Sequence, residues 1–290
     1  MDEYELGKSR TVRYRKVKKL LAETYGYDEF RPRQHEIINT IIRRHDAFGI
    51  MPTGGGKSLC YQLPALYLGK PAIIIQPLIS LMEDQKLILD KMGLKSCCYN
   101  STVFNKDELL EEILENEYQF IFTTPESIVN LQYYLDKLNR VLGISLIAID
   151  EAHCVSSYGH DFRPKYRELG ILRDTLPDVP ILAVTATATP QVIDDIQTSL
   201  KIDVKPIITS FDRPNLYLSV KRKSKDMFTD IISIINKHKN EPIIIYCVTK
   251  NDTNKVADVL QGYGVNCGVY HSDIDTATKS KTHKQFINDK

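Results

Sequence analysis

The sequence Met51-Pro52-Thr53-Gly54-Gly55-Gly56-Lys57-Ser58 joins an apolar run at residues 47–51 to a helical stretch at residues 59–68. Glycines allow backbone N–H groups to turn inward and to approach phosphate oxygens closely. Lys57 would place its positive charge on the β- and γ-phosphates, and Ser58 would offer its hydroxyl to Mg²⁺. The positive end of the following helix dipole also favours an anion. The stretch therefore predicts a loop that binds the phosphates of ATP together with Mg²⁺.

The generic phosphate-loop pattern GxxxxGK[ST] begins with glycine, whereas this sequence has Met51 at that position. The competing interpretation is a glycine-rich turn with an incidental lysine. The strand-like run before the loop and the helical stretch after it favour a phosphate loop, because that context directs backbone N–H groups toward an anion.

An apolar run at residues 146–149 ends in Asp150-Glu151-Ala152-His153. Asp150 is placed to hold Mg²⁺, and Glu151 is placed to orient and polarise the attacking water. His153 is a candidate link between the nucleotide site and a neighbouring domain. Either acid alone is more often a solvated carboxylate at the end of a strand. Phosphoryl transfer needs both a phosphate clamp and a metal-holding acid, so the two motifs together predict an ATP-hydrolysing site.

Short apolar runs alternate with helical stretches along the chain. The runs are apolar on both faces, as parallel strands covered by helices on both sides require. The alternation predicts an α/β fold built on a doubly wound parallel sheet. The expected strands are residues 72–75, 120–122, 146–149 and 180–184, and the expected helices are residues 78–92, 107–114 and 191–200.

A domain boundary is expected near residues 209–214, which gives a first domain at 1–210 and a second at 211–290. In the second domain the pattern predicts helices at 227–236, 251–260 and 276–288, and strands at 242–247 and 266–270. These elements form the opening half of a second α/β unit, since about 80 residues is short for a complete domain.

Composition excludes several classes of protein. The 290 residues contain 38 Lys and Arg against 37 Asp and Glu, which excludes a strongly basic nucleic-acid coat but not a local basic groove. The apolar runs are too short to span a bilayer, and the N-terminus lacks the features of a secretory signal. The six cysteines form no CxxC pair, which argues against a zinc ligand set. We therefore expect a soluble intracellular protein with no membrane partner.

The order and spacing of several motifs resemble the RecQ family of DNA helicases in superfamily 2. Residues 150–156 (DEAHCVS) and 159–164 (GHDFRP) carry the resemblance, and residues 51–65 (MPTGGGKSLCYQLPA) resemble the family's motif I, including Met51. Further similar segments are residues 30–34, 76–85, 123–126, 185–188, 211–216, 244–247 and 270–272. The resemblance implies a RecA-like P-loop domain with a parallel sheet, followed by an incomplete second RecA-like domain.

The resemblance also implies roles for particular residues. In relatives, motif 0 recognises the adenine, so Gln34 is expected to pair with the purine edge while Tyr27 and Arg31 stack on the ring. The loop at residues 156–164 resembles an aromatic-rich loop that couples DNA contact to hydrolysis. The implied ATP-binding residues are Tyr27, Arg31, Gln34 and the loop Met51, Pro52, Thr53, Gly54, Gly55, Gly56, Lys57 and Ser58; the catalytic residues are Lys57, Asp150, Glu151 and His153; the Mg²⁺ ligands are Ser58 and Asp150; and the DNA-binding or coupling residues are Tyr158, His160, Phe162, Arg163, Thr185 and Thr187.

The chain departs from the family pattern in two places. Residues 157–158 are Ser-Tyr where relatives usually carry Gln-Trp, so Tyr158 offers a smaller aromatic face. The chain also reaches Lys290 before the family's motifs V and VI, which carry arginines that stabilise charge on the γ-phosphate. We therefore expect the missing half of the motor to come from the rest of a longer chain or from another chain.

Three functions are consistent with these patterns. The first is an ATP-dependent DNA helicase that moves 3′→5′ along single-stranded DNA and unwinds forked duplexes in recombination, repair or replication. The second is a truncated chain that binds ATP and DNA without unwinding activity, motivated by the missing arginines. The third is a DEAD-box RNA helicase. It is disfavoured because residues 77–81 are Pro-Leu-Ile-Ser-Leu rather than Pro-Thr-Arg-Glu-Leu, and because His153 closes the acidic motif.

Overall fold

The computed structural model describes residues 3–158, 161–212, 215–224, 226–239 and 241–287. The chain separates into two compact units, Met1–Asp212 and Arg213–Lys290. We describe each unit by itself. Among the described helices, none combines the length and the apolar composition needed to cross a membrane.

The first unit is built on a seven-stranded sheet in the order β3-β4-β2-β5-β6-β1-β7, in which every neighbouring pair is parallel. The predicted α/β fold and its parallel sheet are confirmed. The strands are β1 (Ala47–Ile50), β2 (Ala72–Ile75), β3 (Ser96–Tyr99), β4 (Phe120–Thr123), β5 (Leu146–Ile149), β6 (Ile181–Thr185) and β7 (Ile207–Ile208).

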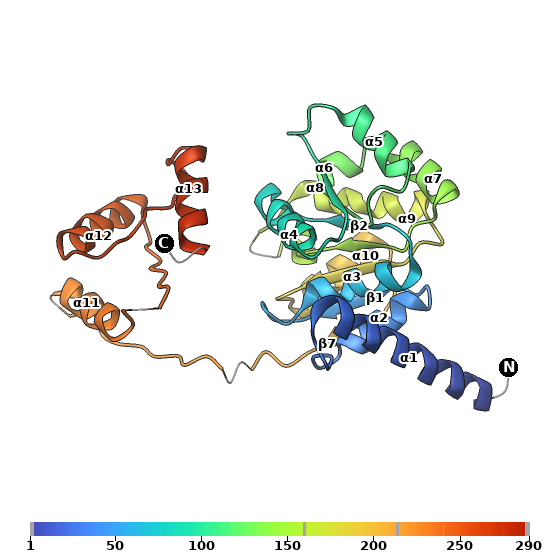
Figure 1. Ribbon diagram of the computed structural model, residues 1–290, viewed down its shortest axis with the longest axis horizontal. Helices are drawn as coiled ribbons and strands as arrows, with labels where there is room; N and C mark the ends of the chain where they lie inside the picture. The colour runs from blue at the N-terminus through green and yellow to red at the C-terminus, as the bar shows by residue number, and fades with distance from the viewer. Residues whose placement is uncertain (1–2, 159–160, 213–214, 225, 240, 288–290) are drawn as a thin grey trace. The chain divides into compact units, whose positions relative to one another are not determined.

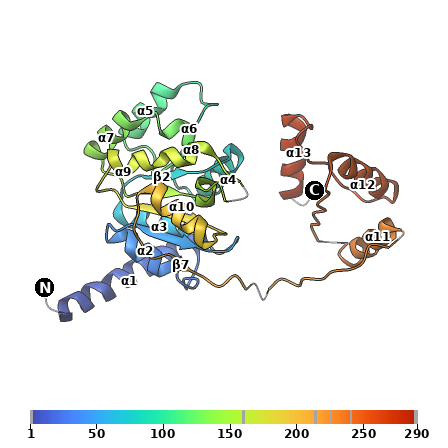
Figure 2. The ribbon, with the colours of Figure 1, turned by 180° about the vertical axis from the view of Figure 1, so that it is seen from behind.

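Helices cover both faces of the sheet (Figures 1 and 2), because alternate strand residues point to opposite sides. In β2, Ile73 and Ile75 join one apolar core and Ala72 and Ile74 join the other. The helices on the first side are α5 (Lys106–Leu114), α6 (Pro125–Ile128), α7 (Gln132–Val141), α8 (Pro164–Arg167), α9 (Ile171–Thr175) and α10 (Pro190–Leu200); those on the second are α2 (Gln34–Ile42), α3 (Lys57–Leu68) and α4 (Ile79–Lys91); the short 3₁₀ helices η1 (Ala152–Val155) and η2 (Glu168–Gly170) lie on the first side.

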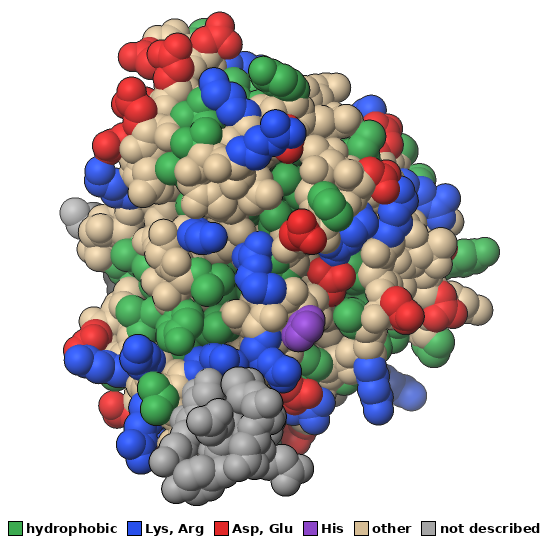
Figure 3. Space-filling view, turned by 90° about the vertical axis from the view of Figure 1, so that its right-hand side faces the viewer, with side chains coloured by type: hydrophobic (Ala, Val, Ile, Leu, Met, Phe, Trp, Pro, Cys, Tyr) green, Lys and Arg blue, Asp and Glu red, His purple; other side chains and the backbone are tan. Residues whose placement is uncertain are grey.

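Helix α1 (Glu3–Tyr25) packs on α2 and α3 through a small third core. Its Val17 and Leu21 are fully buried there, against Ile38, Ile42 and Leu63. Figure 3 views the face from which α1 extends, and Lys and Arg side chains gather around the base of the helix. The helix therefore buries an apolar side in the domain and exposes basic side chains such as Arg15 and Lys16.

The strand order brings three loops of the sequence together at one edge. β5, β6 and β1 are neighbours in the sheet, and all three run in the same direction. Asp150 follows β5, Thr185 is the last residue of β6, and the loop at residues 51–58 follows β1. Carboxyl ends of parallel strands meet at the same edge, so these side chains share one site.

The second unit contains the three predicted helices, α11 (Met227–Lys237), α12 (Lys250–Gly262) and α13 (Thr276–Ile287). The strands predicted at residues 242–247 and 266–270 are wrong, since the described residues of this unit form no strand. Both segments do alternate between half-buried and exposed residues, as in Ile243, Ile245 and Cys247 against Ile244 and Tyr246. These segments are not strands because a strand needs backbone hydrogen bonds to a neighbouring strand. No such ladder joins the two segments in the described part of the unit.

Candidate nucleotide site

The phosphate loop is shaped by glycines that tolerate no side chain. Gly56 precedes α3 with a left-handed backbone (φ 85°), and a Cβ atom there would lie 2.2 Å from Gln34 Nε2. A Cβ atom on Gly55 would lie 2.7 Å from the carbonyl oxygen of Pro52. Lys57 then begins α3, so its ammonium stands at the positive end of a 12-residue helix. The local geometry is that of an anion cradle.

We expect Gly56→Ala to lower the free energy of unfolding by about 1–3 kcal/mol, because the change adds backbone strain and a clash with Gln34. Gly69→Ala is the matched control: Gly69 also has a positive φ (61°), but no atom lies within 4 Å of its added Cβ. Denaturant unfolding of both variants separates strain from clash. If Gly56→Ala and Gly69→Ala lose equal amounts of unfolding free energy, Gln34 does not lie as close to Gly56 as the structure places it.

Gln34 is 1% exposed and joins the segment before α2 to the phosphate loop. Its Nε2 donates to the carbonyl oxygen of Gly56 (3.1 Å), and its Oε1 accepts from the backbone N–H of Arg31 (2.7 Å). Tyr27 and Arg31 are exposed, so their side chains are accessible to a flat ring. Met51 is buried against Cys60 (Sδ to Sγ 3.8 Å), so only its backbone can contribute to the loop.

Asp150 is buried at the end of β5. Its Oδ2 accepts from Gln76 Nε2 (3.0 Å), and its Oδ1 accepts from the backbone N–H of Glu151 (3.0 Å). Burial raises the pKa of Asp150 above its usual value of 3.8, and the Gln76 hydrogen bond and the Lys57 charge oppose that rise. A nearby cation stabilises the charged form of a carboxylate that has lost its water shell.

The side chains of Lys57 and Glu151 face each other. Lys57 Nζ lies 3.9 Å from Glu151 Oε1, so the phosphate loop and the acidic motif meet across the edge of the sheet. The backbone of Glu151 is left-handed (φ 49°), an unfavourable conformation for a residue with a side chain. Strain of this kind is typical of functional turns, and here it turns the chain from β5 into η1.

His153 connects the acidic motif to the end of β6. Its Nδ1 lies 2.9 Å from Thr185 Oγ1 and 3.3 Å from Glu151 Oε2. The tautomer with a proton on Nδ1 can donate to Thr185 Oγ1, and Thr185 Oγ1 in turn donates to the carbonyl oxygen of Thr187 (3.1 Å). The hydrogen bonds run from His153, which lies beside Glu151, to the exposed Thr187 in the loop that leads into α10.

The loop after η1 carries the expected aromatic residues. Tyr158 is 73% exposed and Phe162 is 40% exposed, whereas His160 lies outside the described residues. Arg163 is used within the protein: its Nη1 donates to the carbonyl oxygen of Pro77 (2.6 Å), and its Nε lies 3.6 Å from Asp161 Oδ2. This arginine therefore ties the loop to the segment before α4.

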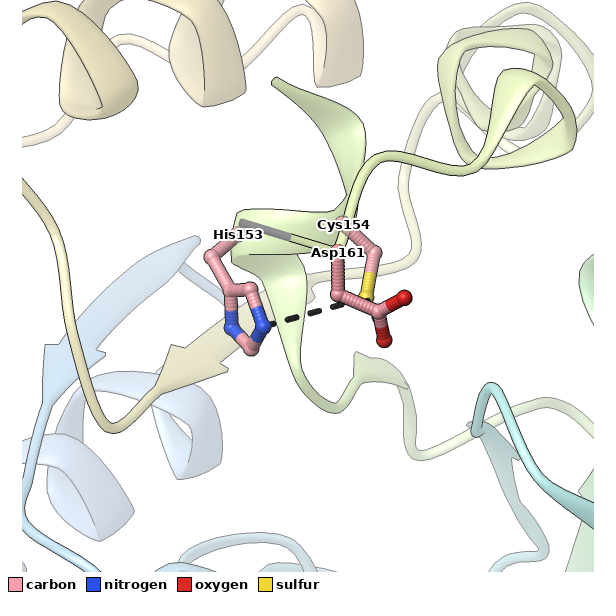
Figure 4. Close-up of side chains that lie close together, drawn as sticks. All are labelled: His153, Cys154 and Asp161. Atoms are coloured by element: carbon pink, nitrogen blue, oxygen red, sulfur yellow. Dashed lines mark hydrogen bonds between the residues drawn. The ribbon is translucent and has the colours of Figure 1, made fainter. Parts of the chain in front are cut away.

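Cys154 anchors the same loop from inside (Figure 4). Its Sγ lies 3.9 Å from His153 Nε2 and donates to Asp161 Oδ2 (3.7 Å). The three side chains are close enough to share a cation. Burial raises the pKa of the Cys154 thiol to about 12, so the thiol keeps its proton and donates it to Asp161. The cluster is best described as a hydrogen-bonded thiol that holds Asp161.

Sequence reasoning missed two polar residues of this region. Gln76 follows the apolar strand β2, which is the same signal that identified Asp150 after β5. Asp195 lies within α10, where it accepts from Ser156 Oγ (2.7 Å) and from Arg167 Nη2 (3.4 Å). Arg167 in turn lies over the ring of Phe162, 5.6 Å from its centre. No local pattern distinguishes Asp195 from a solvent-facing helix residue, so only the fold identifies it.

The residues fit ATP with Mg²⁺. The glycine backbone leaves room for phosphate oxygens, Lys57 supplies a positive charge, and the buried Asp150 offers a carboxylate of the kind that Mg²⁺ prefers. Gln76 Oε1 is also buried without a hydrogen-bond partner among the described residues, which fits a site that ligand or water completes. Ser58 stands beside Lys57 in the first turn of α3.

Fold and site together define a RecA-like P-loop protein of the nucleoside-triphosphate-hydrolysing class. Residues 31–196 match the model of the DEAD/DEAH box helicase family, and the chain belongs to that family.

Comparison with known proteins agrees with this assignment. The chain is 56% identical over 291 residues to a protein of Acanthamoeba polyphaga mimivirus named "Putative ATP-dependent RNA helicase". The match covers 100% of this chain and 53% of the viral protein. It is 39% identical over 280 residues to the ATP-dependent DNA helicase RecQ of Bacillus subtilis, covering 94% of this chain and 47% of that protein. The predicted resemblance to RecQ helicases is confirmed. The chain spans about half the length of the curated relatives it matches.

A solved structure supports the fold alone. The helicase Lhr of Mycobacterium smegmatis, bound to ssDNA and AMP-PNP, superimposes with a TM-score of 0.65 at 14% identity, covering 93% of this chain and 39% of that one.

Proposed function

We propose that this chain binds and hydrolyses ATP with Mg²⁺ as the N-terminal half of a RecQ-type DNA helicase motor. The observation that carries the proposal is the approach of Lys57 to Glu151 (3.9 Å) beside the buried Asp150. In this arrangement Lys57 binds the β- and γ-phosphates, Ser58 and Asp150 hold Mg²⁺, and Glu151 orients the attacking water. Magnesium neutralises charge on the phosphate oxygens when it is bound.

Coupling to nucleic acid is proposed to run through the hydrogen bonds of His153, Thr185 and Thr187 and through the loop that carries Tyr158 and Phe162. Exposed aromatic rings stack on unpaired bases without sequence preference. Because Arg163 already binds the carbonyl oxygen of Pro77, we assign it to positioning the loop, and we assign base contact to the two rings. The proposed movement on single-stranded DNA is 3′→5′.

The proposed domains are residues 1–210, which form the nucleotide-binding half, and residues 211–290, which begin the second half. The rest of the motor, including the arginines that act on the γ-phosphate, is proposed to come from further residues of a longer chain or from another chain. Residues of the second unit such as Tyr246 and Val248 are almost fully exposed, which supports completion by additional structure.

An RNA helicase is the second candidate function, because the mimivirus relative carries that name. Three features favour DNA: the identity to RecQ of Bacillus subtilis, the sequence Pro-Leu-Ile-Ser-Leu at residues 77–81, and His153 at the end of the acidic motif.

Strand displacement and ATP hydrolysis distinguish these functions. We expect single-stranded DNA to stimulate hydrolysis at least about 10-fold more than single-stranded RNA, a difference of roughly 1.4 kcal/mol in transition-state stabilisation. Duplexes with a 3′ single-stranded tail should be unwound, and duplexes with a 5′ tail should not. Stronger stimulation by RNA supports the second candidate. ATP binding without hydrolysis or unwinding, on either polymer, supports a binding module instead.

A further inference from the structure

Helix α1 carries a concentration of positive charge that the nucleotide site does not use. Residues 10–19 read Arg-Thr-Val-Arg-Tyr-Arg-Lys-Val-Lys-Lys, so six of ten residues are basic and none is acidic. The whole chain has a net charge of only +1. A basic stripe on one helix of an otherwise neutral protein is an electrostatic footprint for a polyanion.

The apolar side of the C-terminal half of α1 packs on the domain. Val17 and Leu21 are buried against α2 and α3, so this side cannot insert into a lipid surface or into a groove of a partner. A basic amphipathic helix that binds membranes needs that apolar face free. From residue 11 onward, the accessible side of α1 is mostly charged, and Val12 is the exposed apolar residue there.

The basic residues of α1 divide into two groups. Lys18 pairs with Glu29, and Arg13 donates to Asn39 Oδ1 (3.3 Å), so these two hold the helix on the domain. Arg15 and Lys16 are exposed and have no carboxylate within ion-pair distance among the described side chains. Lys19 Nζ lies 3.6 Å from Glu23 Oε1, but both side chains are largely exposed. Exposed ion pairs of this kind contribute little to the stability of the fold.

Arg15, Lys16 and Lys19 share one side of the helix, since residues three and four apart are neighbours on a helix surface. The four steps along the helix from Arg15 to Lys19 span about 6 Å at ~1.5 Å per residue. That length covers about two phosphate steps, because each strand of DNA carries one phosphate per ~3.4 Å.

We propose that the side of α1 formed by Arg15, Lys16 and Lys19 binds the phosphate backbone of a nucleic acid, as a surface separate from the aromatic loop. The helix is held firmly enough to position such a contact. The Tyr14 ring packs edge-on against His35 (4.7 Å between centres), and Lys18 binds Glu29, on either side of the segment that carries Arg31 and Gln34. A polymer bound to α1 is thus bound to the same unit as the nucleotide site.

The test is the salt dependence of nucleic-acid binding by the 290-residue chain, measured without nucleotide by fluorescence anisotropy. The triple variant Arg15→Gln, Lys16→Gln, Lys19→Gln removes three phosphate contacts. The slope of log K against log salt concentration should therefore become shallower by about 2 for a single strand, at ~0.7 per contact. The control variant Lys91→Gln, Lys137→Gln, Lys205→Gln changes the net charge equally at three exposed sites elsewhere and should keep the slope of the wild type.

Single-stranded DNA, single-stranded RNA and duplex DNA of equal length are the three probes, and the one with the largest loss identifies the natural polymer. The proposal is overturned if the triple variant keeps the wild-type slope on all three, or if the control variant loses as much. Vesicles of anionic lipid serve as a further probe. The proposal is also overturned if the triple variant loses binding to these vesicles and to none of the nucleic acids. Because no ATP is present, a chain that fails to hydrolyse ATP leaves this test unaffected, and the two failures are distinguishable.

Discussion

Lys57→Ala is expected to reduce ATP hydrolysis by about 10²–10³-fold, the loss typical of removing one preorganised group that stabilises transition-state charge. Lys57 is the cation that the structure places at the N-terminal end of α3, and Glu151 lies 3.9 Å from it. In the absence of nucleotide these two charges balance each other. Once ATP is bound, the ammonium is expected to move to the phosphates and leave Glu151 to the water.

Two controls separate binding from chemistry. Lys70→Ala removes an exposed lysine after the end of the same helix and should leave hydrolysis unchanged. Glu151→Gln should retain binding of a fluorescent ATP analogue while hydrolysis is lost, since the amide cannot accept the proton of the water. Titration of the analogue and release of phosphate are measured for each variant. If Lys57→Ala binds and hydrolyses like the wild type, the proposed phosphate loop is wrong.

The phosphate loop and the acidic motif could be predicted because each is a polar motif directly after a continuous apolar run. The same rule applied to residues 72–75 identifies Gln76, which completes the environment of Asp150. Strand β3 could not be predicted in this way. Its residues, Ser-Cys-Cys-Tyr, do not form an aliphatic run, and as an edge strand it has only β4 as a neighbour.

Tertiary contacts decided the remaining features. Whether the apolar segment at residues 242–247 forms a strand depends on a partner for its backbone, which a local pattern does not reveal. The motif that contains Arg163 identified the loop but not the use of its guanidinium, which binds the distant carbonyl oxygen of Pro77. The role of Asp195 could not be predicted for the same reason, because its hydrogen-bond partners Ser156 and Arg167 come from another part of the chain.

Asp150→Asn is expected to abolish hydrolysis, with a loss of at least about 10²-fold, and at the same time to stabilise the nucleotide-free protein. Burial raises the pKa of Asp150, so the folded state pays to keep this carboxylate charged. Asparagine has the same shape, and its carbonyl oxygen can still accept from Gln76 or from the N–H of Glu151. It therefore retains hydrogen bonding without the cost of burying a charge.

The pH dependence of this gain follows from the direction of the shift. A carboxyl whose pKa is higher in the folded than in the unfolded state binds its proton more tightly when folded, so it destabilises the fold only once the pH rises above 3.8. The melting temperature of Asp150→Asn should thus exceed that of the wild type at neutral pH, and the difference should shrink as the pH falls toward 3.8. Adding ATP with Mg²⁺ should raise the melting temperature of the wild type more than that of the variant, because only the charged carboxylate gains from the metal. A variant that is less stable than the wild type at neutral pH, or that gains equally from ATP with Mg²⁺, would show that Asp150 is a structural group and not the residue that holds the metal.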